Sequence, residues 1–325
     1  MAIEVVKPGL ATTVQDAGRE GYYHLGIPLS GAMDQHSFVA ANLLVGNDEA
    51  AAVLECTLMG PELAFRDDAI VAVTGAELEP RVNGSPRPTN ESFPVRAGDV
   101  LSFGLLRAGA RAYLAVAGGI DVPVVLGSRS TYGLGAFGGH CGRKLEKGDV
   151  LPVGKPGPAA RAGRALPAEL CLPLRREVEL RVVPGLYHYR LTEEAARNFF
   201  EDTWSVAPEA DRIGYRYRHG RPLRWKERKQ PFGAGSDPSN IVDAGYPFGS
   251  IQVPGGLEPI VLHRDAVSGG GYAMVGTVIS ADMDCIAQMQ PNNKARFVSV
   301  DLEAALAARG DHRARLDRVR SALAT

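Results

Sequence analysis

The apolar residues of this chain occur mostly in short runs, and each run is bounded by residues that favour turns. Runs bounded by Gly, Pro, Asn or Asp are found at residues 69–74, 100–103, 112–117 and 178–183. Short apolar runs with turn residues on both sides are typical of β-strands. Glycine (38 residues) and proline (22 residues) are frequent but form no low-complexity tract, which favours many strands and turns. We therefore expect a mainly β fold.

Helical patterns are few. Residues 34–45 carry apolar residues at helical spacing, and Gly46 follows at the position where a helix commonly ends. Residues 192–201 begin with Thr192, a favourable N-cap, and two acidic residues that the helix dipole favours. Short helices are also expected at 281–289, 302–308 and 312–324, with Gly310 interrupting the last two.

The length of 325 residues corresponds to about two domains. Segment 153–174 is rich in Ala, Pro, Gly and Arg, and its prolines at 156, 158 and 167 interrupt any helix. It shows no strand alternation and is the best candidate for a linker. We therefore expect an N-terminal β domain at 1–152 and a C-terminal β domain with terminal helices at 175–325.

Charge and cysteine usage exclude several classes of protein. The formal net charge is -1 at pH 7, which gives no support for nucleic-acid binding. The four cysteines lie far apart and form no CxxC pair, so we expect no metal site. Glu4 and Lys7 interrupt the first apolar run, and no apolar stretch approaches the ~18 residues of a membrane helix. These features favour a cytoplasmic protein that contacts neither nucleic acid nor membranes.

Residues 250–291 combine many glycines with polar side chains. Glycines allow the backbone to approach a ligand closely or to turn with positive φ. A purely structural loop needs the glycines, but it does not need so many donors and acceptors for hydrogen bonds. We therefore interpret this block as part of a functional site. Its polar side chains include Gln252, His263, Arg264, Asp265, Ser268, Tyr272 and Gln288.

Two N-terminal segments are further candidates. Residues 12–34 are again glycine-rich and polar, and Asp34 stands where it can cap the first helix, take part in chemistry, or both. Arg143 precedes a predicted strand in a glycine-rich segment, where its guanidinium either clamps an anionic group or lies on the surface of a hairpin. The glycines at 133, 135 and 138 have the spacing of a dinucleotide fingerprint, but the sequence after them cannot begin a helix. We therefore exclude a Rossmann site.

Several motifs, taken in order, resemble one family along almost the whole chain. They are PGLATTVQDAGREGYYHLGIPLSGAMD, YLAVAGGIDVPVVLGSRSTY, GRKLEKGD, DRIGYR and GSIQVPGGLEPIVLHRDAVSGGGY. The family is that of biotin-dependent carboxyltransferases, often labelled allophanate hydrolase subunit 2. Its members include the C-type subunit of ATP-dependent 5-oxoprolinase and the carboxyltransferase region of urea carboxylase. The resemblance implies two cyclophilin-like β-barrel domains with few short helices.

The resemblance also implies a function and partners. The leading hypothesis is a subunit of a 5-oxoprolinase-like lactam hydrolase that works with a smaller B-type subunit and a third lactam-utilisation subunit. ATP is used by such a complex, with no site assigned on this chain. One alternative is biotin-dependent carboxyl transfer to urea or a related amide, with biotin supplied by a separate carrier. Another is a non-enzymatic binding partner of a kinase-inhibitor protein.

Both enzymatic alternatives must handle a neutral carbonyl–nitrogen compound, whose oxygen needs fixed donors and whose N–H needs an acceptor. On this basis the expected catalytic residues are Asp34, Arg143, His263 and Asp265. The expected substrate-binding residues are Ser250, Gln252, Gly270, Tyr272 and Gln288. We expect the N-terminal and C-terminal glycine-rich segments to form one site.

Overall fold

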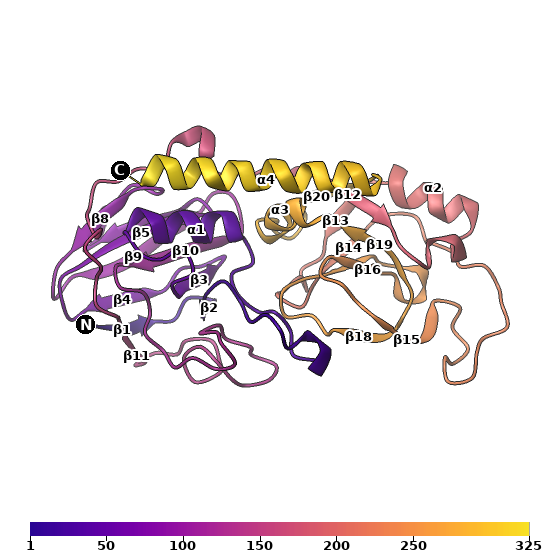
Figure 1. Cartoon of the computed structure of the whole chain (residues 1–325), viewed down its shortest axis with the longest axis horizontal. Helices are drawn as coiled ribbons and strands as arrows, with labels where there is room; N and C mark the ends of the chain where they lie inside the picture. Colours follow the sequence, from indigo (N-terminus) through magenta and orange to yellow (C-terminus); the bar gives the residue numbers. More distant parts are fainter. Residues whose placement is uncertain (325) are drawn as a thin grey trace. The chain divides into compact units, whose positions relative to one another are not determined.

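The computed structural model describes residues 1–324, and they form two compact units (Figure 1). Unit 1 comprises Met1–Glu20, Ser30–Leu174 and the C-terminal residues from Ala314 onward. Unit 2 comprises Gly21–Leu29 and Arg175–Arg313. A short N-terminal segment thus belongs to the second unit, and the predicted linker 153–174 belongs to the first.

Unit 1 is built from two antiparallel sheets. The first sheet has the order β11 (Val150–Pro152), β1 (Ala2–Lys7), β4 (Glu62–Phe65), β9 (Val100–Leu106), β6 (Leu78–Val82) and β7 (Ser85–Pro86). The second has the order β2 (Ala11–Gln15), β3 (Val53–Thr57), β10 (Arg111–Val116), β5 (Ala69–Gly75) and β8 (Ser92–Val95).

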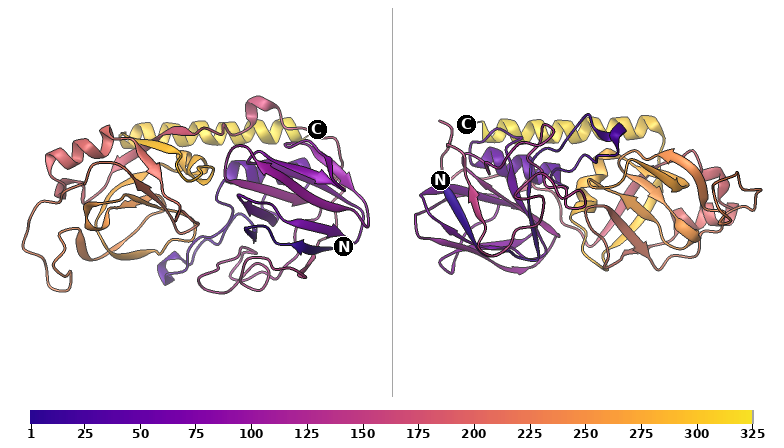
Figure 2. Two further views of the ribbon diagram at one scale, coloured as in Figure 1. Left: turned by 180° about the vertical axis from the view of Figure 1, so that it is seen from behind. Right: turned by 90° about the horizontal axis from the view of Figure 1, so that it is seen from below.

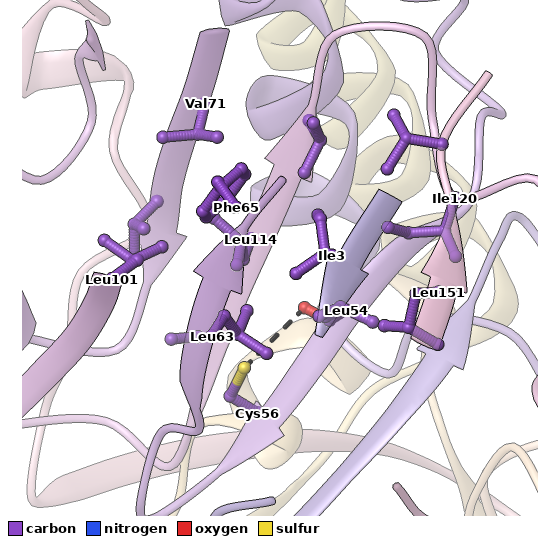
Figure 3. Packing of buried hydrophobic residues seen from close by; sticks show 14 of the residues in the cluster. Ile3, Leu54, Cys56, Leu63, Phe65, Val71, Leu101, Leu114, Ile120 and Leu151 are labelled. Atoms are coloured by element: carbon purple, nitrogen blue, oxygen red, sulfur yellow. Dashed lines mark hydrogen bonds between the residues drawn. The ribbon is translucent and has the colours of Figure 1, made fainter. Parts of the chain in front are cut away.

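The main core of unit 1 lies between these sheets. Side chains from the first sheet, such as Ile3 and Leu63, pack against side chains from the second, such as Leu54 and Leu114 (Figure 3). This arrangement follows from strand alternation, because alternate residues of β1 up to Val5, and of β4, are buried. Cys56 lies in the same cluster.

The other face of the second sheet is covered by helix α1 (Gln35–Leu44). Phe38 and Leu44 of this helix pack with Tyr113 of β10 in a second apolar cluster. Leu170 of the predicted linker and Val319 of the C-terminal helix belong to the same cluster. The linker segment therefore contributes to the interior of unit 1.

Unit 2 is a closed barrel, seen from two further sides in Figure 2. The barrel order is β12 (Glu177–Pro184), β19 (Met274–Val278), β16 (Ser250–Gln252), β17 (Ile260–Leu262), β14 (Gly214–Arg218), β13 (Trp204–Val206) and β20 (Lys294–Ser299). Parallel pairing of β12 with β20 closes it, whereas its other strand pairs are antiparallel.

Unit 2 also contains a separate two-stranded sheet, two complete helices and the first part of a third helix. The sheet pairs β15 (Asn240–Gly245) with β18 (Gly269–Tyr272). The helices are α2 (Glu193–Glu201), α3 (Met283–Ala287) and the start of α4 (Leu302–Leu323). Phe199 of α2 stacks on Phe297 of β20 with ring centroids 4.7 Å apart, which fixes α2 against the barrel.

The prediction of a mainly β chain with two cyclophilin-like β domains is confirmed. Helices α1 and α2 also begin as expected, with Asp34 and Thr192 as N-caps whose side chains accept backbone N–H bonds. The helix expected at 281–289 is shorter, because a 3-10 turn at Ser280–Asp282 precedes α3.

The expected break at Gly310 was wrong, since α4 is one unbroken helix of 22 residues (Figure 1). A glycine inside a helix costs roughly 0.5–1 kcal/mol relative to alanine, a penalty that packing elsewhere along the helix can offset. Val319 and Leu323 of α4 are buried in the second cluster of unit 1, which supplies such packing.

No helix among residues 1–324 is long and apolar enough to cross a membrane. In the same residues, no group of three or more His, Cys, Asp or Glu side chains is arranged to hold a metal ion.

Candidate functional site

The glycine-rich strand β18 lies over the ring of Tyr246 in unit 2. The Tyr246 hydroxyl accepts a hydrogen bond from the Tyr272 backbone N–H (2.7 Å) and donates one to the Tyr272 carbonyl (2.8 Å). A Cβ atom on Gly270 would come within 3.1 Å of the Tyr246 ring. Gly270 is therefore a glycine that allows the close approach of a buried aromatic ring, and Tyr246 sets the conformation of the strand at Tyr272.

Tyr246 is 1% exposed and packs with Leu262, Ala266 and Met274 in a small apolar cluster. Burial raises the pKa of the Tyr246 hydroxyl, whereas hydrogen bonds from the Tyr272 backbone and the Gln252 side chain lower it. The hydroxyl therefore stays protonated around neutral pH and remains a hydrogen-bond donor.

Tyr272 and Gln252 both interact with the Tyr246 hydroxyl, but they differ in solvent exposure. The Tyr272 side chain is 43% exposed, so it is accessible to a ligand. Gln252 ends β16, is 7% exposed and contributes to the environment of the Tyr246 hydroxyl. An exposed phenol can bind the face of a small molecule, and an enclosed amide can read polar atoms.

Asp265 forms a buried ion pair with Arg212. Arg212 Nε and Nη2 donate to the two carboxylate oxygens of Asp265 at 2.7 and 3.0 Å, and the two side chains are 16% and 8% exposed. Backbone bonds from Asp265 N–H to Arg212 O and from His263 N–H to Ile213 O hold the two segments together. The bidentate geometry fixes the carboxylate orientation at the edge of the barrel.

His263 is 2% exposed and lies against the ring of Phe248, with ring centroids 5.2 Å apart. Its Nδ1 accepts the Arg264 N–H at 3.0 Å, and its Nε2 lies 3.2 Å from the Met283 carbonyl. The hydrogen bond at Nδ1 implies the tautomer that carries its proton on Nε2. These contacts are those of a core histidine with fixed orientation, and its catalytic role stays a prediction.

The last two expected binding residues of this block are also buried. Ser250 is 0% exposed, and its hydroxyl donates to the Pro247 carbonyl at 2.6 Å. Gln288 is 4% exposed and caps the C-terminal end of α3. Direct contact with substrate stays a prediction for both residues.

Part of the N-terminal glycine-rich segment also belongs to unit 2. The Tyr23 hydroxyl donates to the Tyr246 carbonyl at 2.6 Å. Tyr246 is therefore contacted both by the N-terminal segment and by strand β18. The sequence indicated neither Tyr23 nor Tyr246, because a single tyrosine in a turn-rich segment carries no distinguishing pattern.

The rest of that N-terminal segment forms a hydrogen-bond network inside unit 1. The Asp16 carboxylate accepts bonds from the Ser128 hydroxyl (2.6 Å), the Ser130 hydroxyl (2.5 Å) and the Arg129 N–H (2.5 Å). The Arg19 guanidinium donates to the Ser130 carbonyl and lies over the Phe137 ring, 4.9 Å from its centroid. The dense polar residues therefore join two loops of unit 1.

Asp34 is buried and caps α1. Its carboxylate accepts the Ser37 N–H at 2.9 Å and the Ser37 hydroxyl at 2.6 Å. Its own N–H donates to the Tyr113 hydroxyl, which in turn donates to Glu55. The capping role that the sequence left open is thus present, and a catalytic role for Asp34 stays a prediction.

Arg143 lies in the hairpin before β11, as one of its two interpretations expected. Its Nη1 and Nη2 donate to the two Asp149 oxygens at 2.8 and 2.9 Å. This pairing holds the pKa of the Asp149 carboxyl well below its usual range. The guanidinium clamps a carboxylate of its own hairpin, and a role toward substrate stays a prediction.

The glycines of β18 show little sign of a cofactor cradle. The space that a Cβ on Gly270 would take is next to the Tyr246 ring, and the spaces at Gly269 and Gly271 face the carbonyls of Ala244 and Ile241. Protein atoms of unit 2 therefore use the room that these glycines leave.

Comparison with known proteins places this geometry in a family. The family model described as "Carboxyltransferase domain, subdomain A and B" matches residues 25–299, which include α1, the barrel and β18. The chain belongs to this carboxyltransferase family.

Two kinds of relative are similar to this chain in sequence, and a structure is compared for one of them. The chain is 36% identical to the C-type subunit of 5-oxoprolinase from Escherichia coli, over 95% of this chain and 94% of that protein. It is 38% identical to the urea amidolyase of Lachancea kluyveri, over 94% of this chain but only 17% of that protein. The solved urea amidolyase of K. lactis superposes with a TM-score of 0.91 at 35% identity, over 98% of this chain and 20% of that one.

Proposed function

We propose that this carboxyltransferase-family chain is a subunit of a 5-oxoprolinase-like, ATP-dependent lactam hydrolase. The observation that carries the proposal is the match to the C-type subunit of 5-oxoprolinase, which extends over 94% of that protein. The name of that relative also motivates the expectation of other subunits. We propose a smaller B-type subunit and a third lactam-utilisation subunit as partners.

In this proposal, a lactam binds beside β18 in unit 2. The exposed Tyr272 side chain contacts the ring, and the enclosed Gln252 amide reads the polar lactam group. Asp265, fixed by Arg212, is the acceptor for the lactam N–H or for a proton released during hydrolysis. A preorganised acceptor of this kind avoids reorienting at the moment of reaction. ATP supplies activation in the complex, with no residue of this chain assigned to it.

The test is ATP-dependent conversion of 5-oxoproline to glutamate by the complex reconstituted with the two other subunits. Asp265→Asn keeps the size of the side chain but removes its charge, and we expect kcat/KM to fall by ~10²-fold, as for loss of one catalytic donor or acceptor. Tyr272→Ala should raise KM more than it lowers kcat, because the aromatic surface that contacts the lactam ring is lost. Tyr189→Ala is the matched control, since Tyr189 is also an exposed tyrosine of unit 2 (68% exposed).

Full activity in Asp265→Asn with normal folding would remove this residue from the site. A correctly assembled complex that cleaves no lactam in the presence of ATP would overturn the proposed function as a whole.

The second candidate is biotin-dependent carboxyl transfer to urea or a related amide. It is favoured by the TM-score of 0.91 and by the 38% identity to urea amidolyases. Biotin would have to be brought to the site by a separate carrier. Incubation with a carboxylated biotin carrier and urea distinguishes the two functions, because only the second candidate then produces carboxylated urea without ATP.

A further inference from the structure

Unit 1 contains a cavity of about 420 Å³, and all of its lining residues belong to this unit. It lies between the first turn of α1, the end of β5, the segment that precedes unit 2 and Arg315 of α4. A volume of this size falls in the range of small-molecule sites in proteins.

The floor of the cavity is polar and fixed. His36, Ser37 and Thr74 are at most 4% exposed and line it. His36 Nε2 lies 2.6 Å from the Leu170 carbonyl, and the Thr74 hydroxyl donates to the Ser37 carbonyl at 2.7 Å. Because these bonds hold the side chains in place, the floor is preorganised.

Charges of both signs line the same cavity. Arg315 donates through Nη2 to the Cys171 carbonyl at 2.7 Å, and its Nε is buried without a hydrogen-bond partner. Glu77 and Glu169 provide carboxylates, and both residues are exposed. Within residues 1–324, none of these three side chains belongs to an ion pair at 4.0 Å or less.

The pKa of the Cys171 thiol is affected by charges of both signs. Burial raises the pKa of this thiol, Arg315 lowers it, and Glu169 raises it. Arg315 and Glu169 therefore both act on one group in the cavity wall, yet they lie beyond salt-bridge distance of each other. A ligand that carries both a cation and an anion can bridge them, and each charge then gains a partner.

We propose that this cavity binds a small α-amino acid as its zwitterion. The carboxylate of the ligand pairs with the Arg315 guanidinium, and its ammonium group pairs with Glu169, with Glu77 nearby. Ala40 and Leu166, which also line the cavity, give the ligand side chain an apolar surface. The inference is independent of the lactam chemistry in unit 2.

The test is isothermal titration calorimetry of the purified chain with the common L-amino acids, each measured separately. Propanoate and ethylamine serve as half-molecule probes that carry only one of the two charges. We expect at least one amino acid to bind and both half-molecules to bind more weakly by about tenfold or more, the effect of one charge-assisted hydrogen bond.

Variants then identify the cavity. Glu169→Gln and Arg315→Gln should each weaken binding of that amino acid by about tenfold or more. Ala168→Trp should have a larger effect and abolish binding. Ala168 is an exposed residue of the cavity lining, and we expect a large side chain there to block the cavity. Arg318→Gln is the matched control, because Arg318 is an exposed arginine on the same helix outside the cavity lining.

Binding of no common amino acid would overturn the inference. So would an amino acid that binds equally to wild type, Glu169→Gln and Ala168→Trp, since both of these changes are at exposed positions and leave the buried floor intact.

Discussion

Replacing Tyr246 by phenylalanine tests how the glycine-rich strand is held. The change removes one oxygen, which accepts the Tyr272 N–H at 2.7 Å and donates to the Tyr272 carbonyl at 2.8 Å. A hydrogen bond contributes about 0.5–1.5 kcal/mol net, so losing two corresponds to about 1–3 kcal/mol. Tyr272 is 43% exposed, and water can replace part of the loss. We therefore expect about 1–2 kcal/mol of local destabilisation of β18.

The measurement must be local, because a chain of two compact units need not unfold in a single two-state step. Amide hydrogen exchange at Tyr272 reports the opening of β18, and a loss of about 1–2 kcal/mol should speed this exchange by roughly 5- to 30-fold. The aromatic ring of the variant still fills the apolar cluster, so amides elsewhere in the barrel should exchange at their normal rates.

Tyr217→Phe is the matched control. Tyr217 is 0% exposed in the same unit, but its hydroxyl contacts the Met289 sulfur at 3.5 Å, which is a weak interaction. Unchanged exchange at Tyr272 in Tyr246→Phe would refute the role assigned to this hydroxyl. An equal increase in Tyr217→Phe would show that loss of any buried hydroxyl in the barrel has the same effect.

Three further predictions concern helix α4, the cysteines and the hairpin of unit 1. Gly310→Ala should stabilise the protein by roughly 0.5–1 kcal/mol, measured by urea unfolding, because a Cβ there meets no atom within 4 Å; a loss of stability would contradict a continuous helix. Burial raises the pKa of Cys56 to about 12 whereas Cys141 is exposed, so iodoacetamide at mildly alkaline pH should label Cys141 in the folded protein and leave Cys56 unmodified. Asp149→Asn should destabilise unit 1 by about 1–3 kcal/mol at neutral pH. Arg143 lowers the pKa of Asp149 in the folded state, so the stability that this ion pair contributes is fully present above the unfolded pKa of about 3.9. This stability is lost as pH falls through the folded pKa of Asp149. A difference in stability between wild type and Asp149→Asn that persists in strong acid would contradict the ion pair.

Local patterns in the sequence predicted the elements whose cause is local. Asp34 and Thr192 were identified as caps because the capping bond joins residues three positions apart. The β content followed from short apolar runs between turn residues. The continuous α4 could not be predicted, because the packing of Val319 and Leu323 that stabilises it depends on residues far along the chain.

In the candidate site, too, features with a local cause were predicted and features that depend on distant residues were not. Asp265 was identified as a polar residue in a glycine-rich block, but its partner Arg212 lies 53 positions away and its role as an ion-pair partner has no local signature. Tyr246 was missed for the same reason, since its importance comes from the distance between its hydroxyl and the backbone of Tyr272.

Glycine-rich composition predicts a close approach, but it does not say which group approaches. At Gly270 that group is the ring of Tyr246, and at Gly31, whose φ is +84°, it is the backbone of Gly18, 2.7 Å from where a Cβ would lie. Neither glycine therefore needs a ligand to explain it. Side chains that remain exposed or charged after the internal packing and hydrogen bonds of the chain are formed are therefore the better guide to function. In unit 2 they include Tyr272, which is open to solvent, and Asp265, which Arg212 holds in a bidentate ion pair, so substitutions at these two positions are a direct way to separate substrate binding from the packing of the barrel.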